Sequence, residues 1–327
     1  MPIVVHRVLC SRPDARIVNI LSQERRMRVH SAALAATLVA VTSSQTLGAQ
    51  ASKLEGAWKS LGGRVVAPDT AYDIPAFTGL AVIHGRYISQ TWAIQPPNGV
   101  QQAGELKDAD AKAARYDAMI ANAATIDVHE KTFVFHFQQA KDPAVVGQST
   151  SREYALHGDT LFSTDTFPWS KDKTKLVRTT LIFLRLPAKP ASRLDGAWRH
   201  LSSDFSAPDT SFHRSPLKGL LVIHGSYYSR TFALDAKSEG GQVHDPADAQ
   251  SKAARYDALI MNAGVLTFDG ETFTQHVEEA TNLAVVGTFT RVHYRLHGDT
   301  LFTTATEPWP TDSTKVVRSS INFVRVR

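Results

Sequence analysis

Short stretches of alternating apolar and polar residues run through the chain and are separated by turns that contain Gly, Pro or Asp. The clearest is 87–94, where Tyr87, Ser89, Thr91 and Ala93 share one face and the residues between them share the other. A period of two residues is that of a β-strand whose faces meet different surroundings. The pattern predicts strands at 56–61, 79–84, 87–94, 124–128, 132–140, 147–156, 160–166 and 176–186.

One segment between these strands has a helical composition instead. Residues 108–123 are rich in Ala and contain no Gly or Pro, and Ala114, Ala118 and Ala121 are spaced to share one face of a helix. A tight hairpin turn is expected at Gly158-Asp159, because both residues tolerate a positive φ. The first half of the chain therefore predicts about eight short antiparallel strands and one helix.

The second half repeats the first at a fixed distance of 140 residues. Leu54-Glu-Gly-Ala-Trp58 returns as Leu194-Asp-Gly-Ala-Trp198, no gap is needed, and nearly half of the paired positions are identical. A repeat of about 135 residues has the size of a whole domain. We therefore expect two copies that each fold alone, at 52–187 and 192–327, with a linker at 188–191.

Residues 1–51 belong to neither copy. They contain a basic cluster at 25–28, an apolar run at 31–41, and the small residues Ala49 and Ala51 at the spacing that signal peptidase recognises. The apolar run is too short to span a bilayer, which takes about 20 residues. We predict a secretory leader cleaved near Ala49 to Ala51, and a periplasmic or secreted mature chain without a membrane span.

The leader changes how the charge of the chain is interpreted. The chain has 36 Lys and Arg against 31 Asp and Glu, but six of these basic and two of these acidic residues lie in 1–51. The remaining 30 basic and 29 acidic residues nearly cancel. The composition therefore indicates no nucleic-acid partner. The single cysteine, Cys10, also lies in the leader, so each copy is held together by its core alone.

Four motifs in a fixed order resemble the bacterial lipocalin-like domain family, and both copies carry them. In the first copy they are Leu54-x-Gly-x-Trp58, Ala-Ala-Arg115-Tyr116, Thr132-Phe-x-x-His136, and Val146-Gly147 leading to Leu156-His-Gly-Asp-Thr-Leu161. The resemblance implies a small β-barrel with an internal cavity but no settled activity, and a tandem pair departs from the usual single-domain form. We expect a mainly β protein of two tandem lipocalin-like antiparallel β-barrels, each with one inserted α-helix. Eight strands close around an interior that holds one small ligand.

Recurring polar residues are the candidates for ligand binding. His136 and its repeat His276 lie on a strand, where an imidazole can bind a carboxylate or act as a base. Arg115 and its repeat Arg255 lie on the helix, where each can pair with an acid or contact a ligand. The remaining candidates come from the alternating strand and its repeat; they are Tyr87, Thr91, Tyr227 and Thr231.

The orientation of strand 87–94 decides which side chains line the cavity. In the orientation that we favour, the identical residues such as Thr91 line both cavities, while the varied positions Gln90 and Arg230 face solvent. In the opposite orientation the varied positions face inward. The two copies would then differ in preference, and only the second would favour a carboxylated ligand, through Arg230.

Several well-known chemical motifs are missing from the sequence. It contains no HExxH, no His and Cys cluster with zinc spacing, no G-x-S-x-G and no phosphate loop. We therefore assign no catalytic residue, metal or cofactor. We favour a carrier or sensor of a small apolar ligand, with the two barrels packed on each other. The alternatives are a cavity enzyme of the isomerase or cyclase type that uses His136 and His276, and a structural or interaction module with filled barrels.

Overall fold

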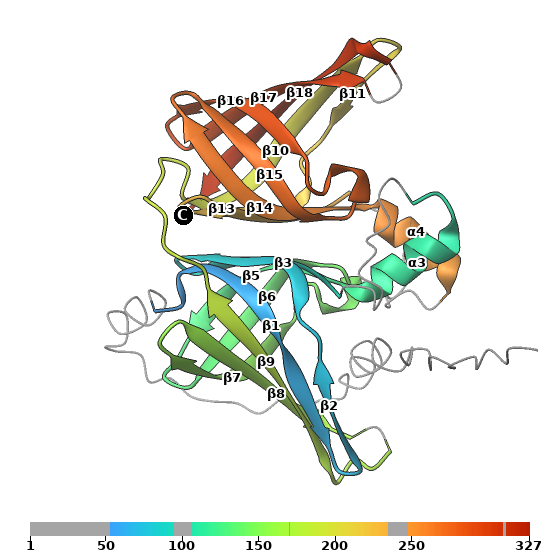
Figure 1. The fold of residues 1–327 in the computed structure, drawn as a ribbon, viewed down its shortest axis with the longest axis vertical. Coiled ribbons are helices and arrows are strands. Elements are labelled where there is room, and N and C mark those ends of the chain that lie inside the picture. Colours follow the sequence, from blue (N-terminus) through green and yellow to red (C-terminus); the bar gives the residue numbers. More distant parts are fainter. Residues whose placement is uncertain (1–52, 95–105, 170, 235–247, 310–311) are drawn as a thin grey trace, which may run out of the picture.

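The computed structural model describes residues 53–94, 106–169, 171–234, 248–309 and 312–327. The leader expected at 1–51 and its cleavage site near Ala49 to Ala51 lie outside these ranges. Within them the chain forms two antiparallel sheets, one from each copy, and each sheet closes on itself. Figure 1 shows the two barrels one above the other, with the two helices side by side at one edge.

The first barrel has eight wall strands in chain order, and it closes where the last pairs with the first. The wall strands are β1 (Gly56–Ala67), β3 (Phe77–His84), β4 (Tyr87–Ile94), β5 (Met119–Val128), β6 (Thr132–Ala140), β7 (Ser149–His157), β8 (Thr160–Pro168) and β9 (Leu176–Arg185). A ninth strand, β2 (Thr70–Ile74), pairs with the outer half of β1. Helix α3 (Ala109–Ala118) precedes β5, and a short 3₁₀ turn at Pro143–Val145 follows β6.

The second barrel has the same order and closure. Its wall strands are β10 (Gly196–Ala207), β12 (Lys218–His224), β13 (Tyr227–Ala233), β14 (Leu259–Asp269), β15 (Thr272–Ala280), β16 (Phe289–His297), β17 (Thr300–Trp309) and β18 (Asp312–Val326). Strand β11 (Thr210–Arg214) pairs with β10, and helix α4 (Ala249–Asp257) precedes β14. The expected fold class, two tandem antiparallel barrels with one inserted helix each, is confirmed.

The helix is shorter than the sequence indicates. Its start is as expected, because the Asp108 side chain accepts a hydrogen bond from the amide of Ala111 at 2.7 Å and so caps the first turn. However, the Ala-rich segment continues as β5 from Met119 onward. Ala121 and Ala123 are 3% and 0% exposed in the contact with the second barrel. Tertiary packing of small side chains therefore overrides the helix preference of Ala.

Each barrel is closed at one end by the tryptophan of its opening motif. Trp58 is 1% exposed, and its Nε1 donates to the carbonyl oxygen of Leu54 at 2.9 Å. The guanidinium of Arg185, from the last strand, lies over the Trp58 ring at 4.4 Å. Arg325 lies over Trp198 in the same way at 4.2 Å. These contacts hold the first and last strands together at the end of each barrel that the tryptophan closes.

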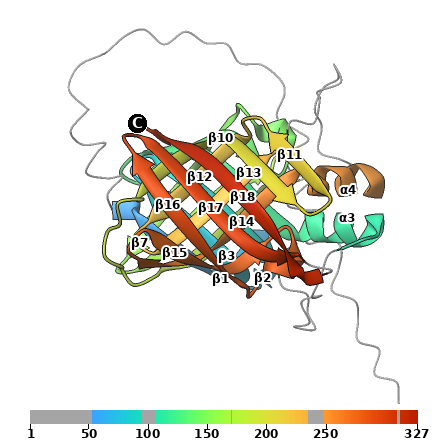
Figure 2. The same ribbon diagram turned by 90° about the horizontal axis from the view of Figure 1, so that it is seen from above.

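The two barrels pack through one face of each sheet. Strands β3 and β4 lie against β12 and β13, and helix α3 lies against α4. Figure 2 shows the pair from above, with the two helices next to each other at one side. Helices α3 and α4 run antiparallel, because Lys112 near the start of α3 contacts Asp257 at the end of α4, and Lys252 contacts Asp117 in the same way. The expectation that the barrels pack on each other is confirmed.

Candidate functional site

The interior of each barrel is lined by the positions of β4 and β13 that differ between the copies. Ile88 and Trp92 belong to the apolar core of the first barrel, and Tyr228 and Phe232 belong to that of the second. Gln90 lines the same interior between Ile88 and Trp92. Because side chains alternate along a strand, the identical positions must point the other way.

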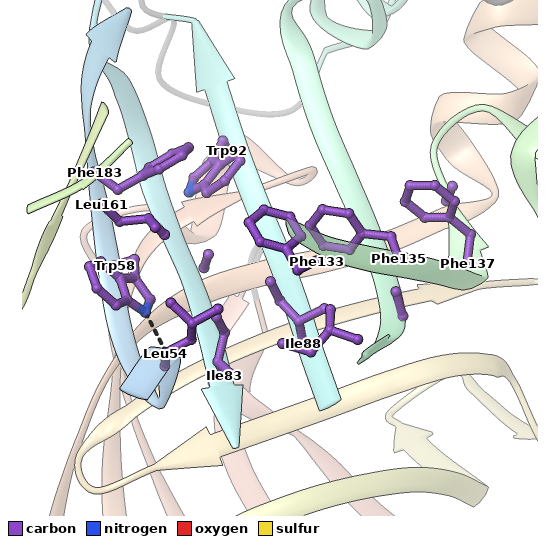
Figure 3. Packing of buried hydrophobic residues seen from close by; sticks show 14 of the residues in the cluster. Leu54, Trp58, Ile83, Ile88, Trp92, Phe133, Phe135, Phe137, Leu161 and Phe183 are labelled. Atoms are coloured by element: carbon purple, nitrogen blue, oxygen red, sulfur yellow. Dashed lines mark hydrogen bonds between the residues drawn. The ribbon is translucent and has the colours of Figure 1, made fainter. Parts of the chain in front are cut away.

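The first barrel contains a small, partly open cavity of about 30 Å³. Apolar residues form most of its wall, and Figure 3 shows the aromatic rings among them. The polar residues at the wall are Gln90, Arg152 and Ser163. An apolar wall with a few polar groups is typical of a small-molecule site. This space has room for only one or two water-sized groups, so a larger ligand would have to displace some of the rings that line it.

Two polar groups inside the first barrel lack partners. The Nε1 donor of Trp92 and the Oδ1 acceptor of Asn122 are both buried without a hydrogen bond. Trp92 stacks on Phe183 with ring centroids 5.0 Å apart, so its position is fixed by packing. A buried polar group without a partner costs about 1–3 kcal/mol. A ligand oxygen could satisfy the Trp92 donor.

The second interior differs in chemistry at three paired positions. Tyr228, Arg230 and Gln275 stand where the first copy has Ile88, Gln90 and Phe135. The Tyr228 hydroxyl accepts a hydrogen bond from Gln275 at 2.7 Å, and burial raises its pKa to about 12. The two interiors therefore place their hydrogen-bond donors at different positions, since the first has Trp92 and Arg152 where the second has Phe232 and Val292.

His200 also lies in the second interior, where the first copy has Ser60. It is 4% exposed, it packs against Phe232 and Phe323, and its Nδ1 accepts a hydrogen bond from the amide of Leu217 at 3.1 Å. Burial lowers the pKa of His200 to about 4, with smaller contributions from Arg230, Arg214 and His213.

The lowered pKa of His200 predicts a loss of stability in acid. Between pH 6.5 and about 4 the unfolded chain binds a proton at this position and the folded chain does not, so the free energy of unfolding falls as the pH falls through this window. One pKa unit corresponds to about 1.4 kcal/mol, which allows a loss of about 2–3 kcal/mol. His200→Asn keeps an acceptor for Leu217 without titrating and should flatten this part of the curve. Urea unfolding of both forms from pH 4 to 7 checks it, and equal slopes would contradict it.

The expected orientation of strand 87–94 is wrong. Thr91 and Thr231 are both 0% exposed at the contact between the barrels, where Thr91 donates to the carbonyl oxygen of Arg230 at 3.2 Å and Thr231 donates to that of Gln90 at 3.3 Å. Ser229 donates to Ser89 at 3.1 Å in the same contact.

The two tyrosines of this face also lie at the contact rather than in a cavity. Tyr227 belongs to an apolar cluster built from both barrels, and the Tyr87 hydroxyl donates to the carbonyl oxygen of Arg327 at 2.7 Å. The four candidates Tyr87, Thr91, Tyr227 and Thr231 therefore join the two barrels. The physical reason is that their small or hydroxylated side chains allow two sheets to approach and pair.

Arg115 and Arg255 each reach across to the other barrel. The Arg115 guanidinium pairs with Glu279, which is 0% exposed. Arg255 donates to the carbonyl oxygen of Ala140 at 2.9 Å, close to Gln139, the position that corresponds to Glu279. Arg115 thus pairs with an acid, as the sequence indicates, but neither arginine lies in a barrel interior.

Two lysine–aspartate ion pairs also link the barrels, between helices α3 and α4. Lys112 contacts Asp257 at 2.7 Å, and Lys252 contacts Asp117 at 2.6 Å. These two pairs are counterparts 140 residues apart, and so are the hydrogen bonds of Thr91 and Thr231. The contact is therefore close to a two-fold, self-complementary interface of the kind that homodimers use.

His136 and His276 lie on the outer faces of β6 and β15. The Nε2 of His136 lies 2.8 Å from Asp127, and its Nδ1 lies 2.7 Å from Ser149. The neighbouring Phe133, Phe135 and Phe137 take the inward positions. The His276 ring instead stacks on Phe289, which is 69% exposed. The hydrogen-bonded group of Asp127, His136 and Ser149 therefore lies on the outer side of the sheet, away from the cavity.

Within the described ranges, no three His, Cys, Asp or Glu side chains are grouped in a way that would hold a metal ion. None of the helices in those ranges is long and apolar enough to cross a membrane. The candidate site is the pair of barrel interiors, where Trp92 of the first barrel and Arg230 of the second have buried donors without a hydrogen-bond partner.

Fold and interior together define a mainly β protein of two joined closed barrels. No family model matches the chain, and no curated protein is significantly similar to it. Among solved structures, the chain is similar to a protein of unknown function of the DUF3598 family from Nostoc punctiforme, at 10% identity over 88% of this chain and 100% of that one, with a TM-score of 0.25. It is also similar to a Trp-176-Ala mutant of transferrin binding protein B from Haemophilus parasuis, at 8% identity over 82% of this chain and 64% of that one, with a TM-score of 0.22. These scores are too low to carry an argument about function.

Proposed function

We propose that the protein is an exported tandem barrel protein that binds a small apolar molecule in its barrel interiors. The observation that carries the proposal is the apolar cavity of the first barrel, which has the unpartnered Trp92 donor in its wall. A molecule with an apolar body and one acceptor oxygen complements both features. Burial of the apolar body would supply most of the affinity, and the acceptor would fix the orientation.

The identity of the ligand can be sought directly. Native mass spectrometry of the full chain purified from its own host should show a bound species that is lost on denaturation. The full chain should also bind a neutral fluorescent probe, such as the methyl ester of cis-parinaric acid.

Ala81→Leu should block the first cavity. Ala81 lines it and is 3% exposed, and the second copy carries Leu221 at the same position, so the substitution suits the fold. We expect affinity for the neutral probe at this barrel to fall about tenfold or more, since overfilling a packed interior costs about 1–3 kcal/mol. Fluorescence titration of the full chain measures it.

Two further variants sharpen this test. Ala155→Leu makes the same change at an exposed position of β7 and should leave binding unaltered. Trp92→Phe introduces the residue of the second copy and should weaken a ligand with an acceptor oxygen about three- to tenfold, the value of one hydrogen bond. If the chain carries no ligand and binds no apolar probe, the proposal fails and filled structural barrels remain. If Ala81→Leu binds the probe as the unaltered chain does, the first cavity is not a binding site.

A further inference from the structure

The interior of the second barrel contains a guanidinium without a counter-charge. Arg230 lies on β13 between Tyr228 and Phe232, both 2% exposed and both in the apolar core of this barrel. The residue as a whole is partly exposed, but its Nε is buried without a hydrogen-bond partner, and no described acid forms an ion pair with it. Burial lowers the pKa of Arg230. Glu307, whose charge acts on Arg230, is exposed and accepts a hydrogen bond from Thr290 instead.

Other arginines at interior or interface positions have partners. Arg115 pairs with Glu279, Arg152 in the first interior lies 3.7 Å from Asp165, and Arg255 donates to a carbonyl oxygen. Removing a charge from water without pairing it costs several kcal/mol. Arg230 is partly removed from water and has no such partner, so an anion at the barrel interior would supply the missing counter-charge.

The neighbours of Arg230 are neutral donors. The Tyr228 hydroxyl accepts from Gln275, so its own proton is free to be donated. Since the Nδ1 of His200 accepts from Leu217, the neutral ring carries its proton on Nε2. Asn262, directly opposite Arg230 on β14, offers a buried Oδ1 without a partner, but an amide oxygen does not neutralise the charge.

We propose that the second barrel binds the carboxylate of an amphiphilic acid through Arg230, supported by Tyr228 and His200. The proposal rests on the binding function above and names the ligand class of the second barrel. A guanidinium and a carboxylate match in charge and geometry. The apolar chain of the acid would lie among the core side chains, such as Phe323 and Leu301. The first barrel, with Ile88, Gln90 and Ser60 at the corresponding positions, lacks this donor set.

The test compares cis-parinaric acid with its methyl ester on the full chain. The unaltered protein should bind the acid more tightly than the ester. Arg230→Gln, which introduces the residue of the first copy, should weaken the acid about ten- to hundredfold and leave the ester nearly unchanged. Arg318→Gln removes an exposed arginine from β18 of the same barrel and should change neither affinity. Arg230→Met provides a second variant if Arg230→Gln folds poorly.

Each outcome is decisive. An acid preference that survives in both Arg230 variants overturns the carboxylate site, and so does equal binding of acid and ester by the unaltered protein. In that second case the ester still binds, so the binding function itself stands. Absence of binding by either probe overturns both proposals. Thermal unfolding without ligand gives an independent check, since Arg230→Met should melt no lower than the unaltered chain once the unpaired charge is gone.

Discussion

Arg115→Ala should destabilise the protein far more than Arg255→Ala, although the two residues are repeats of each other. Loss of the Arg115 guanidinium leaves the Glu279 carboxylate buried and unpaired between the barrels. Such a loss typically costs about 3–5 kcal/mol. Arg255 donates hydrogen bonds to carbonyl oxygens and to the neutral Gln139, and the charge of Asp142 also acts on it, so its removal should cost about 1–3 kcal/mol. Urea unfolding of the full chain measures the difference.

A double-substitution cycle separates the ion pair from its surroundings. Glu279→Gln introduces the residue that the first copy has at this position, and it should rescue most of the loss caused by Arg115→Ala. When Glu279→Gln is combined with Arg255→Ala, the two losses in the free energy of unfolding should be additive. Equal costs for the two arginine variants, or no rescue by Glu279→Gln, would show that the pairing does not bear on stability.

Each copy, expressed alone, should form a symmetric dimer. Leu80, Val82, Leu220 and Val222 are all 0% exposed in the cluster that joins the barrels, so separation would expose them to water. Burying one such side chain stabilises by about 1.5–3 kcal/mol. Because the contact is self-complementary, a second identical copy can cover the same face. We therefore expect each isolated copy to fold and to form a dimer through this face.

The two dimers should differ in strength. In a dimer of the second copy, Arg255 of each subunit would meet Glu279 of the other, which gives two ion pairs. In a dimer of the first copy, Arg115 would meet Gln139, so the arginine–glutamate pairs would be missing while the lysine–aspartate pairs between the helices would form in both dimers. Light scattering of 52–187 and 192–327 over a range of concentrations measures both dissociation constants. Monomers at high concentration, or an unfolded fragment, would argue against this assignment of the face.

The repeat also shows why the fold could be predicted from the sequence and the binding residues could not. Strand period, hairpin glycines and motif order predicted two barrels, and the structure has them. Identity between the copies at 87–94 favours a shared cavity lining in the sequence, yet a two-fold contact also requires the same surface on both copies. The varied positions Gln90 and Arg230 face two separate interiors, which are free to diverge. Positions that differ between the copies, rather than identical ones, therefore indicate which side chains face the barrel interiors.

Other differences have local causes. The hairpin of β1 and β2 turns at Pro68-Asp69, and β2 lies at the edge of the barrel with mostly exposed residues. Such a strand has little apolar alternation to detect. Side chains alternate along β6, so His136 can line the cavity only if Phe133, Phe135 and Phe137 face outward. Their burial as a stack settles the orientation, and a single sequence cannot show which of two strand faces is covered.

The self-complementary face has a consequence for concentrated solutions. The first barrel of one molecule can pack against the second barrel of another molecule. The chains can then swap barrels without forming any new kind of contact. The short connection between the copies keeps the two halves at a local concentration of the order of millimolar, which favours closure within one chain. A shorter connection would remove that advantage, and the same interface would then assemble chains into interlocked pairs.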